Sequence, residues 1–299
     1  LLFNYRPVKG TKSAGDPADV TAVIKALLTA KNPVIYAGQG VLWAEASDEL
    51  VELAELLNIP VMTTNTGKGC FPENHPLSLG TGANTMTKMV RHFLDKSDLV
   101  MGIGSSFTTG LASTGIPSGK VLIQCTIDDR DLNKEHYLDH AIVGDAKIVL
   151  SQLIEEAKEH IGAGDKTKDD SVTETIARIK QEWLQEWMPL LTSNETPINP
   201  YRIIWDLMNT VDRSNTIVTH DSGHPRDQTI PFYETITPRG YLGWGNSTQL
   251  GYGLGLAMGA KLGAPEKLVV NIMGDAAIGM AGMDIENAAR MEIPILTIV

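Results

Sequence analysis

Cysteine is scarce in this sequence. Only Cys70 and Cys125 occur among 299 residues. Their separation fits neither a metal-binding pair nor a local disulfide. The sequence therefore predicts two buried thiols in a reducing compartment and no zinc site.

Long apolar runs are missing as well. Runs such as residues 267–273 fall far short of the ~20 residues that a membrane-spanning helix needs. The first residues also lack the charged-then-apolar pattern of a signal peptide. We therefore expect a cytoplasmic protein that has no membrane partner.

Positive charge is in the minority. The chain has 25 lysine and arginine residues against 36 aspartate and glutamate residues, which gives a formal net charge of −11 at pH 7. Acidic side chains are spread along segments of helical character such as 47–57 and 151–159. Because a phosphate backbone requires a cationic stripe, we expect no nucleic-acid partner.

Strand and helix signals alternate along most of the chain. Apolar residues at helical spacing predict helices at 19–30, 49–57, 90–94 and 145–158, and apolar runs predict strands at 33–38, 59–63, 98–102 and 121–128. This order is typical of parallel sheets covered by helices. The predicted fold class is α/β, with two doubly wound, mainly parallel-sheet domains, the first of them Rossmann-like.

The composition turns polar between Gly162 and about Ile198. We interpret residues 1–163 as one domain, 164–198 as a linker and 199–299 as a second domain. The linker contains a tryptophan-bearing helix that is expected to end before Pro189. In the second domain we expect helices at 201–209 and 250–262, strands at 216–219 and 268–273, and an irregular polar loop after the first of these strands.

The segment Met273-Gly274-Asp275-Ala276-Ala277 carries the clearest chemistry, because a buried strand runs out into Gly-Asp and small residues. Glycine lets a backbone approach phosphate closely, and amides at a helix start point at the anion. A carboxylate supplies a hard oxygen to Mg²⁺ or Ca²⁺. The alternative is a plain strand-to-helix turn in which Asp275 caps the helix.

Residues 274–277, followed by 285–290 and 293–299, resemble the fingerprint of thiamine-diphosphate-dependent enzymes. In that family a Gly-Asp-Gly is followed further along by Asn-Asn, and the Asp and an Asn coordinate the metal. The resemblance assigns Asp275 to Mg²⁺ and Gly274, Ala276 and Ala277 to the diphosphate. Ala276 stands where the family has glycine, which raises the question of backbone strain. The expected Asn-Asn falls beyond Val299, so this domain is interpreted as truncated at its C-terminus.

Residues 246–255 resemble the Gly-Thr-Met-Gly-Phe-Gly-Leu-Pro stretch of the same family. The resemblance makes Leu250 the apolar residue that props the thiamine in its bent form. Thr248 falls where a backbone carbonyl accepts from the pyrimidine amino group, and Gln249 lies between the two. The alternative for Leu250 is a core residue. On either interpretation, a glycine-rich helix is expected to pack closely on a sheet through Gly253, Gly255 and Gly259.

Residues 220–226, His-Asp-Ser-Gly-His-Pro-Arg, follow a predicted strand and resemble the loop that presents polar groups to the diphosphate. His224 matches the family histidine, and it would donate a hydrogen bond to an anionic oxygen. Ser222 and Gly223 would add a hydroxyl and an amide. The alternative is a surface turn with a satisfied histidine.

The first half of the chain resembles the central domain of acetolactate synthases. The matching segments are 31–40, 59–64, 67–69, 97–100 and 127–129. In relatives this domain binds FAD, ADP or nothing, and Gly38-Gln39-Gly40 with residues 102–106 offers a nucleotide cradle. Flavin-containing relatives carry Arg-Phe-Asp where this chain has Ser106-Phe107-Thr108, so FAD is possible but not favoured.

The resemblance implies a thiamine-diphosphate- and Mg²⁺-dependent enzyme that makes or breaks C–C bonds next to a carbonyl, as acetolactate synthase does. It implies a small 2-oxoacid or acyl-CoA-type substrate, a cofactor that serves as electron sink, and a homodimer or homotetramer. The activating glutamate is expected in an N-terminal domain that precedes Leu1. Catalytic residues within this chain are therefore unknown, and we expect the fragment alone to be inactive.

Other functions stay open. The resemblance also allows activity of the 2-hydroxyacyl-CoA lyase, oxalyl-CoA decarboxylase or benzoylformate decarboxylase type, or a non-catalytic nucleotide-binding or regulatory relative. A dinucleotide-binding oxidoreductase would need Gly-x-Gly-x-x-Gly at the start of a helix. The segment Gly38-Gln39-Gly40-Val41-Leu42-Trp43 fails at the third glycine.

Overall fold

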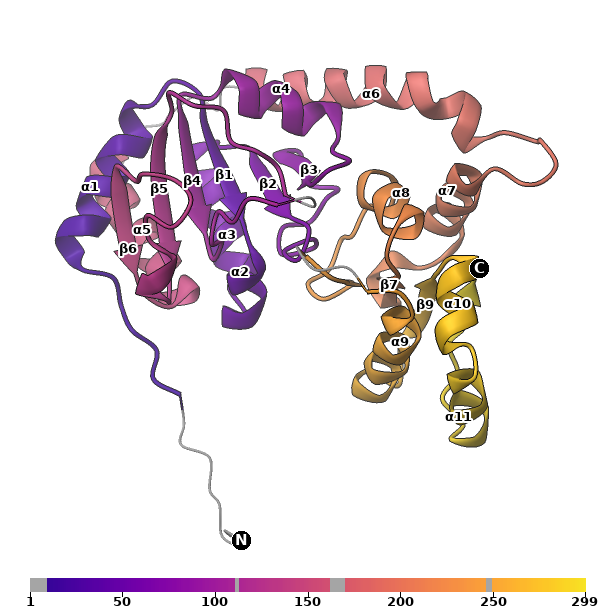
Figure 1. The fold of residues 1–299 in the computed structure, drawn as a ribbon. Coiled ribbons are helices and arrows are strands. Elements are labelled where there is room, and N and C mark those ends of the chain that lie inside the picture. The colour runs from indigo at the N-terminus through magenta and orange to yellow at the C-terminus, as the bar shows by residue number, and fades with distance from the viewer. Residues whose placement is uncertain (1–9, 111–112, 162–169, 246–248) are drawn as a thin grey trace, which may run out of the picture.

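The computed structural model describes residues 10–110, 113–161, 170–245 and 249–299. These residues form two α/β lobes, each built on one sheet (Figure 1). Every pairing between the described strands is parallel. The predicted fold class is therefore confirmed. Within the described ranges, no helix has the length and apolar character that crossing a membrane requires.

The first lobe has a six-stranded sheet in the order β3-β2-β1-β4-β5-β6. Its strands are β1 (Pro33–Ala37), β2 (Val61–Thr64), β3 (Ser78–Gly82), β4 (Leu99–Ile103), β5 (Val121–Thr126) and β6 (His140–Val143). Its helices are α1 (Pro17–Thr29), α2 (Gln39–Ala44), α3 (Ser47–Leu57), α4 (Lys88–Lys96) and α5 (Ala146–Ile161), with the 3-10 helix η1 (Asp129–Asp131). The strand order reverses between β1 and β4, and α/β proteins bind ligands outside the carboxyl ends of such strands.

Helices cover both faces of this sheet because successive side chains of a strand point to opposite sides. In β1, Ile35 and Ala37 belong to one core with side chains of α1, α3 and α5. Val34 and Tyr36 belong to a second core with side chains of α4 and of the long helix α6 (Ser171–Leu191). Cys70 and Cys125 are free and buried, as predicted.

The second lobe has a four-stranded sheet in the order β10-β9-β7-β8. Its strands are β7 (Thr216–His220), β8 (Tyr241–Leu242), β9 (Leu268–Ile272) and β10 (Leu296–Ile298). Its helices are α7 (Pro200–Thr210), α8 (His224–Phe232), α9 (Tyr252–Gly263), α10 (Asp275–Ala281) and α11 (Asp284–Arg290), with the 3-10 helix η2 (Arg213–Asn215). Here the order reverses between β7 and β9.

Two sequence predictions about proline-containing segments are wrong. The residues after β7 were expected to form an irregular loop, but α8 begins at His224 and contains Pro231 near its end. The helix expected to end before Pro189 continues to Leu191. Leu191 is fully buried, so the apolar surface removed from water there offsets the hydrogen bond that the proline cannot donate.

The two lobes are in direct contact. Trp183 of α6 stacks on Phe232 of α8, with ring centroids 5.0 Å apart and an interplanar angle of 5°. In the loop after β2, the buried Lys68 ammonium donates to the Glu73 carboxylate at 2.6 Å and to the Ile230 carbonyl of α8 at 3.0 Å. Glu73 also accepts from the Thr235 amide at 2.7 Å. A buried ion pair of the first lobe thus holds the last turn of α8.

Candidate cofactor site

The predicted cofactor residues gather at the carboxyl edge of the second sheet. The strands β7 and β9 are paired so that His220 lies beside Ile272. The segments that leave these two strands, 221–223 and 273–274, are therefore neighbours. This is the place where the strand order reverses, and a ligand site is expected there.

Asp221 holds this edge together. Its fully buried carboxylate accepts hydrogen bonds from the amides of Ser222 at 2.8 Å, Gly251 at 3.1 Å and Gly253 at 3.0 Å. It thereby satisfies amides that the first turn of α9 leaves without intrahelical partners. The sequence analysis assigned no role to Asp221. Two signals were nevertheless present: an acidic residue directly after a predicted strand, and a glycine-rich helix start further along whose amides need an acceptor.

The glycines of α9 differ in their packing. A Cβ on Gly253 would lie 2.8 Å from Asn271 Oδ1 and 3.0 Å from Asp221 Oδ2, so this position has no room for a side chain. A Cβ on Gly255 or Gly259 would meet nothing within 4 Å. Close packing on the sheet, expected of all three glycines, is wrong for Gly255 and Gly259.

The loop after β7 brings several predicted residues to the edge. The Ser222 hydroxyl donates to the Gln249 carbonyl at 2.9 Å, which ties this loop to the segment before α9. Gly223 adopts φ 82°, a conformation that favours glycine, and space in front of its Cα is open. His224 follows as the first residue of α8, and it is exposed.

The strand β9 ends in the predicted metal motif. Gly274 caps α10, Asp275 is the first residue of that helix, and the Asp275 carboxylate accepts from the Ala276 amide at 2.8 Å. Ala276 lies in helical backbone, so alanine introduces no strain there. The Ala277 side chain is buried with Leu254 and Met273, which leaves only its backbone amide for a ligand.

Two of the three residues predicted to contact the thiamine rings, Gln249 and Leu250, are described by the structure. The Leu250 side chain is 39% exposed, so the core alternative is wrong for this residue. Gln249 is also exposed. Thr248 lies outside the described residues. An exposed leucine beside the cofactor edge is available for an apolar contact with a bound ring.

The residues of this edge fit a diphosphate that shares a divalent cation. Asp275 supplies one exposed carboxylate, and in the described ranges no cluster of three or more His, Cys, Asp and Glu side chains forms a complete metal cage. Mg²⁺ is commonly held by one or two carboxylates together with phosphate oxygens and water. A Cβ added at Gly223 or Gly274 would meet no described atom within 4 Å, so the described residues leave room for an anion beside their backbone.

His220 is a buried titratable group next to this site. Its Nδ1 lies 3.0 Å from the Asp221 carbonyl, to which it donates, and 3.3 Å from the Tyr252 hydroxyl. Its ring stacks on Tyr241 at 5.3 Å. Burial lowers the pKa of His220 to about 4, because a charged imidazole would lose its hydration. The imidazole is therefore neutral at physiological pH.

This burial predicts acid sensitivity. The unfolded chain takes up a proton at His220 near the ordinary pKa of 6.5, whereas the folded protein does so only near 4. The contribution of this residue to stability is full above pH 6.5 and is lost as the pH falls toward 4. We expect the urea midpoint to fall across this window and the fall to be smaller in His220→Asn. A pH dependence in His220→Asn as steep as that of the wild type would contradict the assignment.

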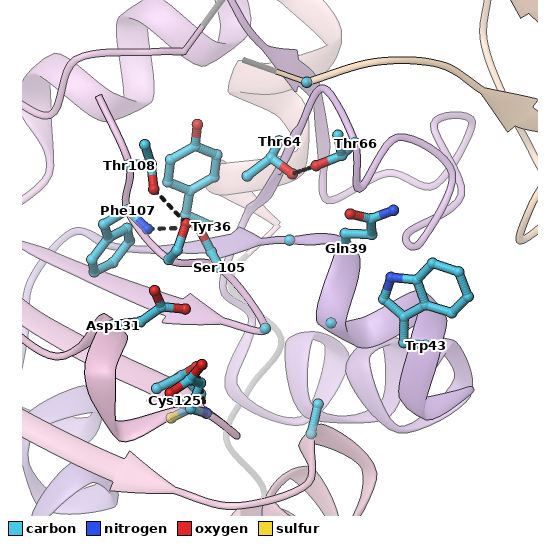
Figure 2. Close-up of a pocket in the computed structure, with 18 of the residues that line it drawn as sticks. Tyr36, Gln39, Trp43, Thr64, Thr66, Ser105, Phe107, Thr108, Cys125 and Asp131 are labelled. Carbon is cyan, nitrogen blue, oxygen red and sulfur yellow. Dashed lines mark hydrogen bonds between the residues drawn. The ribbon is translucent and has the colours of Figure 1, made fainter. Parts of the chain in front are cut away.

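A second concavity lies at the carboxyl edge of the first sheet. It has a volume of about 660 Å³ and lies where β1 and β4 end, with Trp244 and Gly245 of the second lobe at its border. Figure 2 shows Gln39 and Trp43 of α2 on one side of this cavity and Phe107 and Asp131 on the other.

Comparisons with known proteins agree with the two-lobed arrangement. Residues 20–153 match the family described as thiamine pyrophosphate enzyme, central domain. Residues 221–299 match the thiamine pyrophosphate enzyme, C-terminal TPP binding domain. The domain limits 1–163, 164–198 and 199–299 stay predictions.

Several curated relatives align with almost the whole chain. The chain is 34% identical to a probable acetolactate synthase large subunit of Methanococcus aeolicus, over 99% of this chain and 50% of the relative. The chain is also 34% identical to a probable acetolactate synthase large subunit of Methanocaldococcus jannaschii, over 99% of this chain and 49% of the relative. It is 33% identical to the acetolactate synthase large subunit of Corynebacterium glutamicum, over 98% of this chain and 46% of the relative. The chain thus spans about half the length of the curated relatives it matches.

Proposed function

The chain belongs to the thiamine pyrophosphate enzyme family, and from this premise we propose that its protein uses thiamine diphosphate and Mg²⁺ to join or cleave 2-oxoacids as acetolactate synthase does. The observation that carries the proposal is the carboxyl edge of β7 and β9. There an exposed carboxylate, Asp275, and the open Gly274 follow β9, and the open Gly223 follows the neighbouring strand β7. A diphosphate with its cation needs this combination of groups.

Each part of the edge has a proposed task. Asp275 binds Mg²⁺, and the backbone of Gly274, Ala276 and Ala277 faces the diphosphate. Ser222, Gly223 and His224 contact the diphosphate from the other strand. Thr248, Gln249 and Leu250 contact the thiamine rings. Asp221 positions these groups, because its carboxylate fixes the start of α9 relative to the loop after β7.

When bound, thiamine diphosphate supplies a nucleophilic carbon and an electron sink. The described residues contribute binding and orientation. His224, at the start of α8, donates a hydrogen bond to an anionic oxygen, which is strengthened by the charge of the acceptor. Leu250 loses solvent exposure against the bound ring, and this burial favours the complex.

We also propose that the protein is a homodimer or homotetramer. Support comes from the exposed apolar side chains in and beside α10 and α11, where Met280 is 68%, Met283 86% and Met291 62% exposed. Large apolar side chains that are this exposed gain free energy when an interface buries them. Light scattering on the purified protein reports the mass directly, and a monomer at working concentration would refute this part.

The test of function is product analysis with the whole protein. Pyruvate with thiamine diphosphate and Mg²⁺ should yield acetolactate and CO₂. Benzoylformate, oxalyl-CoA and a 2-hydroxyacyl-CoA ester serve as the competing substrates, and preferential turnover of one of them would reassign the reaction. A protein that binds the cofactor but converts none of the four would be a non-catalytic relative.

A further inference from the structure

The cavity at the carboxyl edge of the first sheet lies where the strand order reverses, which is where α/β sheets bind ligands. Its glycine amides, however, already donate hydrogen bonds within the protein. The Gly38 amide donates to the Ile103 carbonyl, the Gly40 amide to the Gly104 carbonyl and the Gly104 amide to the Cys125 carbonyl, each at 2.9 Å. A Cβ on Gly38 would lie 2.3 Å from the Gly104 oxygen. These glycines therefore allow two backbone segments to touch, and they leave no phosphate cradle.

The first amides of α5, which begins at this edge, also have a hydrogen-bond partner within the protein already. Asp145 lines the cavity and is buried. Its carboxylate accepts from the Lys147 amide at 3.1 Å and the Ile148 amide at 3.4 Å, in the first turn of α5. A phosphate placed there would have to displace a carboxylate from the amides that it caps.

The charge of the cavity opposes an anion as well. Asp128, Asp131 and Asp145 line it, and no described lining residue is a lysine or an arginine. Arg130 pairs with Asp128 at 2.6 Å but is 85% exposed and outside the cavity. Lys134 lies 3.7 Å from Asp131 and Lys12 lies 3.8 Å from Asp145, so each of the three carboxylates has a cationic partner outside the lining. A diphosphate would therefore face three carboxylates and no described lining cation that could pair with it, which disfavours its binding.

The remaining lining suits an uncharged ligand. Ten of the lining residues carry a hydroxyl or an amide side chain: Gln39, Thr64, Asn65, Thr66, Ser105, Ser106, Thr108, Ser113, Thr114 and Thr126. Trp43 stands at the border with 71% of its surface exposed, and Phe107 lies inside (Figure 2). The volume of about 660 Å³ lies in the range of small-molecule sites.

We propose that this cavity binds an uncharged, nucleoside-type ligand, with a flat ring against Trp43 and sugar hydroxyls toward Asp131 and the threonine and serine side chains, and that it rejects the diphosphate forms FAD and ADP. Asp131 lies in the 3-10 helix η1 after β5, and its carboxylate is a suitable acceptor for sugar hydroxyls. The large aromatic surface of Trp43 favours a stacked ring. The inference does not depend on the function proposed for the second lobe.

Calorimetric titration with matched pairs tests this proposal. Adenosine should bind about tenfold or more tightly than ADP, and riboflavin likewise relative to FAD. Trp43→Ala should weaken adenosine binding about tenfold, whereas Tyr137→Ala, which removes an aromatic side chain that is 94% exposed and outside the cavity, should not. Ser106→Arg should raise the affinity for ADP, because it adds the missing cation.

Two results would overturn the proposal. One is binding of ADP or FAD that equals or exceeds binding of its uncharged partner, and the other is no binding of either uncharged compound. Thiamine diphosphate titrated into the same samples reports on the second lobe separately. Unchanged affinity for it in Trp43→Ala and Ser106→Arg shows that both variants are folded.

Discussion

Replacement of Lys68 by methionine should lower the free energy of unfolding by about 3–5 kcal/mol, the range found when one partner of a buried ion pair is removed. The side chains of Lys68 and Glu73 are 1% and 4% exposed. Methionine fills similar volume, but it leaves the Glu73 carboxylate buried without a cation. Urea unfolding of the variant and the wild type at pH 7 measures the difference.

An exposed pair provides the matched control. Lys88 pairs with Glu186, and these side chains are 49% and 54% exposed. Lys88→Met should cost no more than about 1 kcal/mol, because water solvates both partners and screens the pair. The double variant Lys68→Met with Glu73→Gln should recover part of the lost stability, since no unpaired charge then remains buried. Equal losses at Lys68 and Lys88 would contradict the argument.

The position of this ion pair links stability to the cofactor edge. Lys68 belongs to the first lobe, yet it donates to the Ile230 carbonyl in α8. The same helix begins with His224. A loosened α8 would carry His224 with it, so Lys68→Met should also weaken thiamine diphosphate binding. Lys68 acts through α8 in this respect and is a positioning residue.

Strands buried on both faces were readable from the sequence. β1 and β4 are continuous apolar runs, and β5 and β9 are nearly so, interrupted by Gln124 and Thr126 in β5 and by Asn271 in β9. Parallel strands that are covered on both sides typically have this composition. β3 reads Ser-Leu-Gly-Thr-Gly, which gives no such signal, and it is a strand because β2 pairs with it. α8 was missed because two prolines disguise it, while contacts with the first lobe stabilise it.

The candidate site was also only partly readable from the sequence. Asp275, Gly274 and the loop after β7 stood out because their sequence resembles the motifs of a known cofactor-binding family. Asp221 did not, because its partners are backbone amides that lie 30 and 32 residues further along the chain. Gly38 and Gly40 gave a misleading signal: glycine permits close approach of phosphate or of another backbone, and only the structure distinguishes the two.

Asp275→Ala should weaken thiamine diphosphate binding at least about 100-fold in the presence of Mg²⁺, a loss of about 2.8 kcal/mol. The reason is that Asp275 is the one exposed carboxylate of the described metal motif and supplies a hard oxygen to the cation. Calorimetric titration of the whole protein measures the effect. Asp284→Ala, which removes an exposed carboxylate from the first turn of α11, is the matched control and should bind normally.

The effect of Asp275→Ala on thiamine diphosphate binding in the absence of metal shows whether Asp275 coordinates Mg²⁺ or is only a charge near the site. With EDTA present, the Asp275 carboxylate repels the diphosphate, so Asp275→Ala should then bind as tightly as the wild type or more tightly. Chelation should therefore weaken binding to the wild type and leave the variant unchanged. Equal sensitivity of both proteins to EDTA would show that the cation is held elsewhere. Because Asp275 is exposed, its removal should change the urea midpoint little, and a loss of binding is then not a loss of fold.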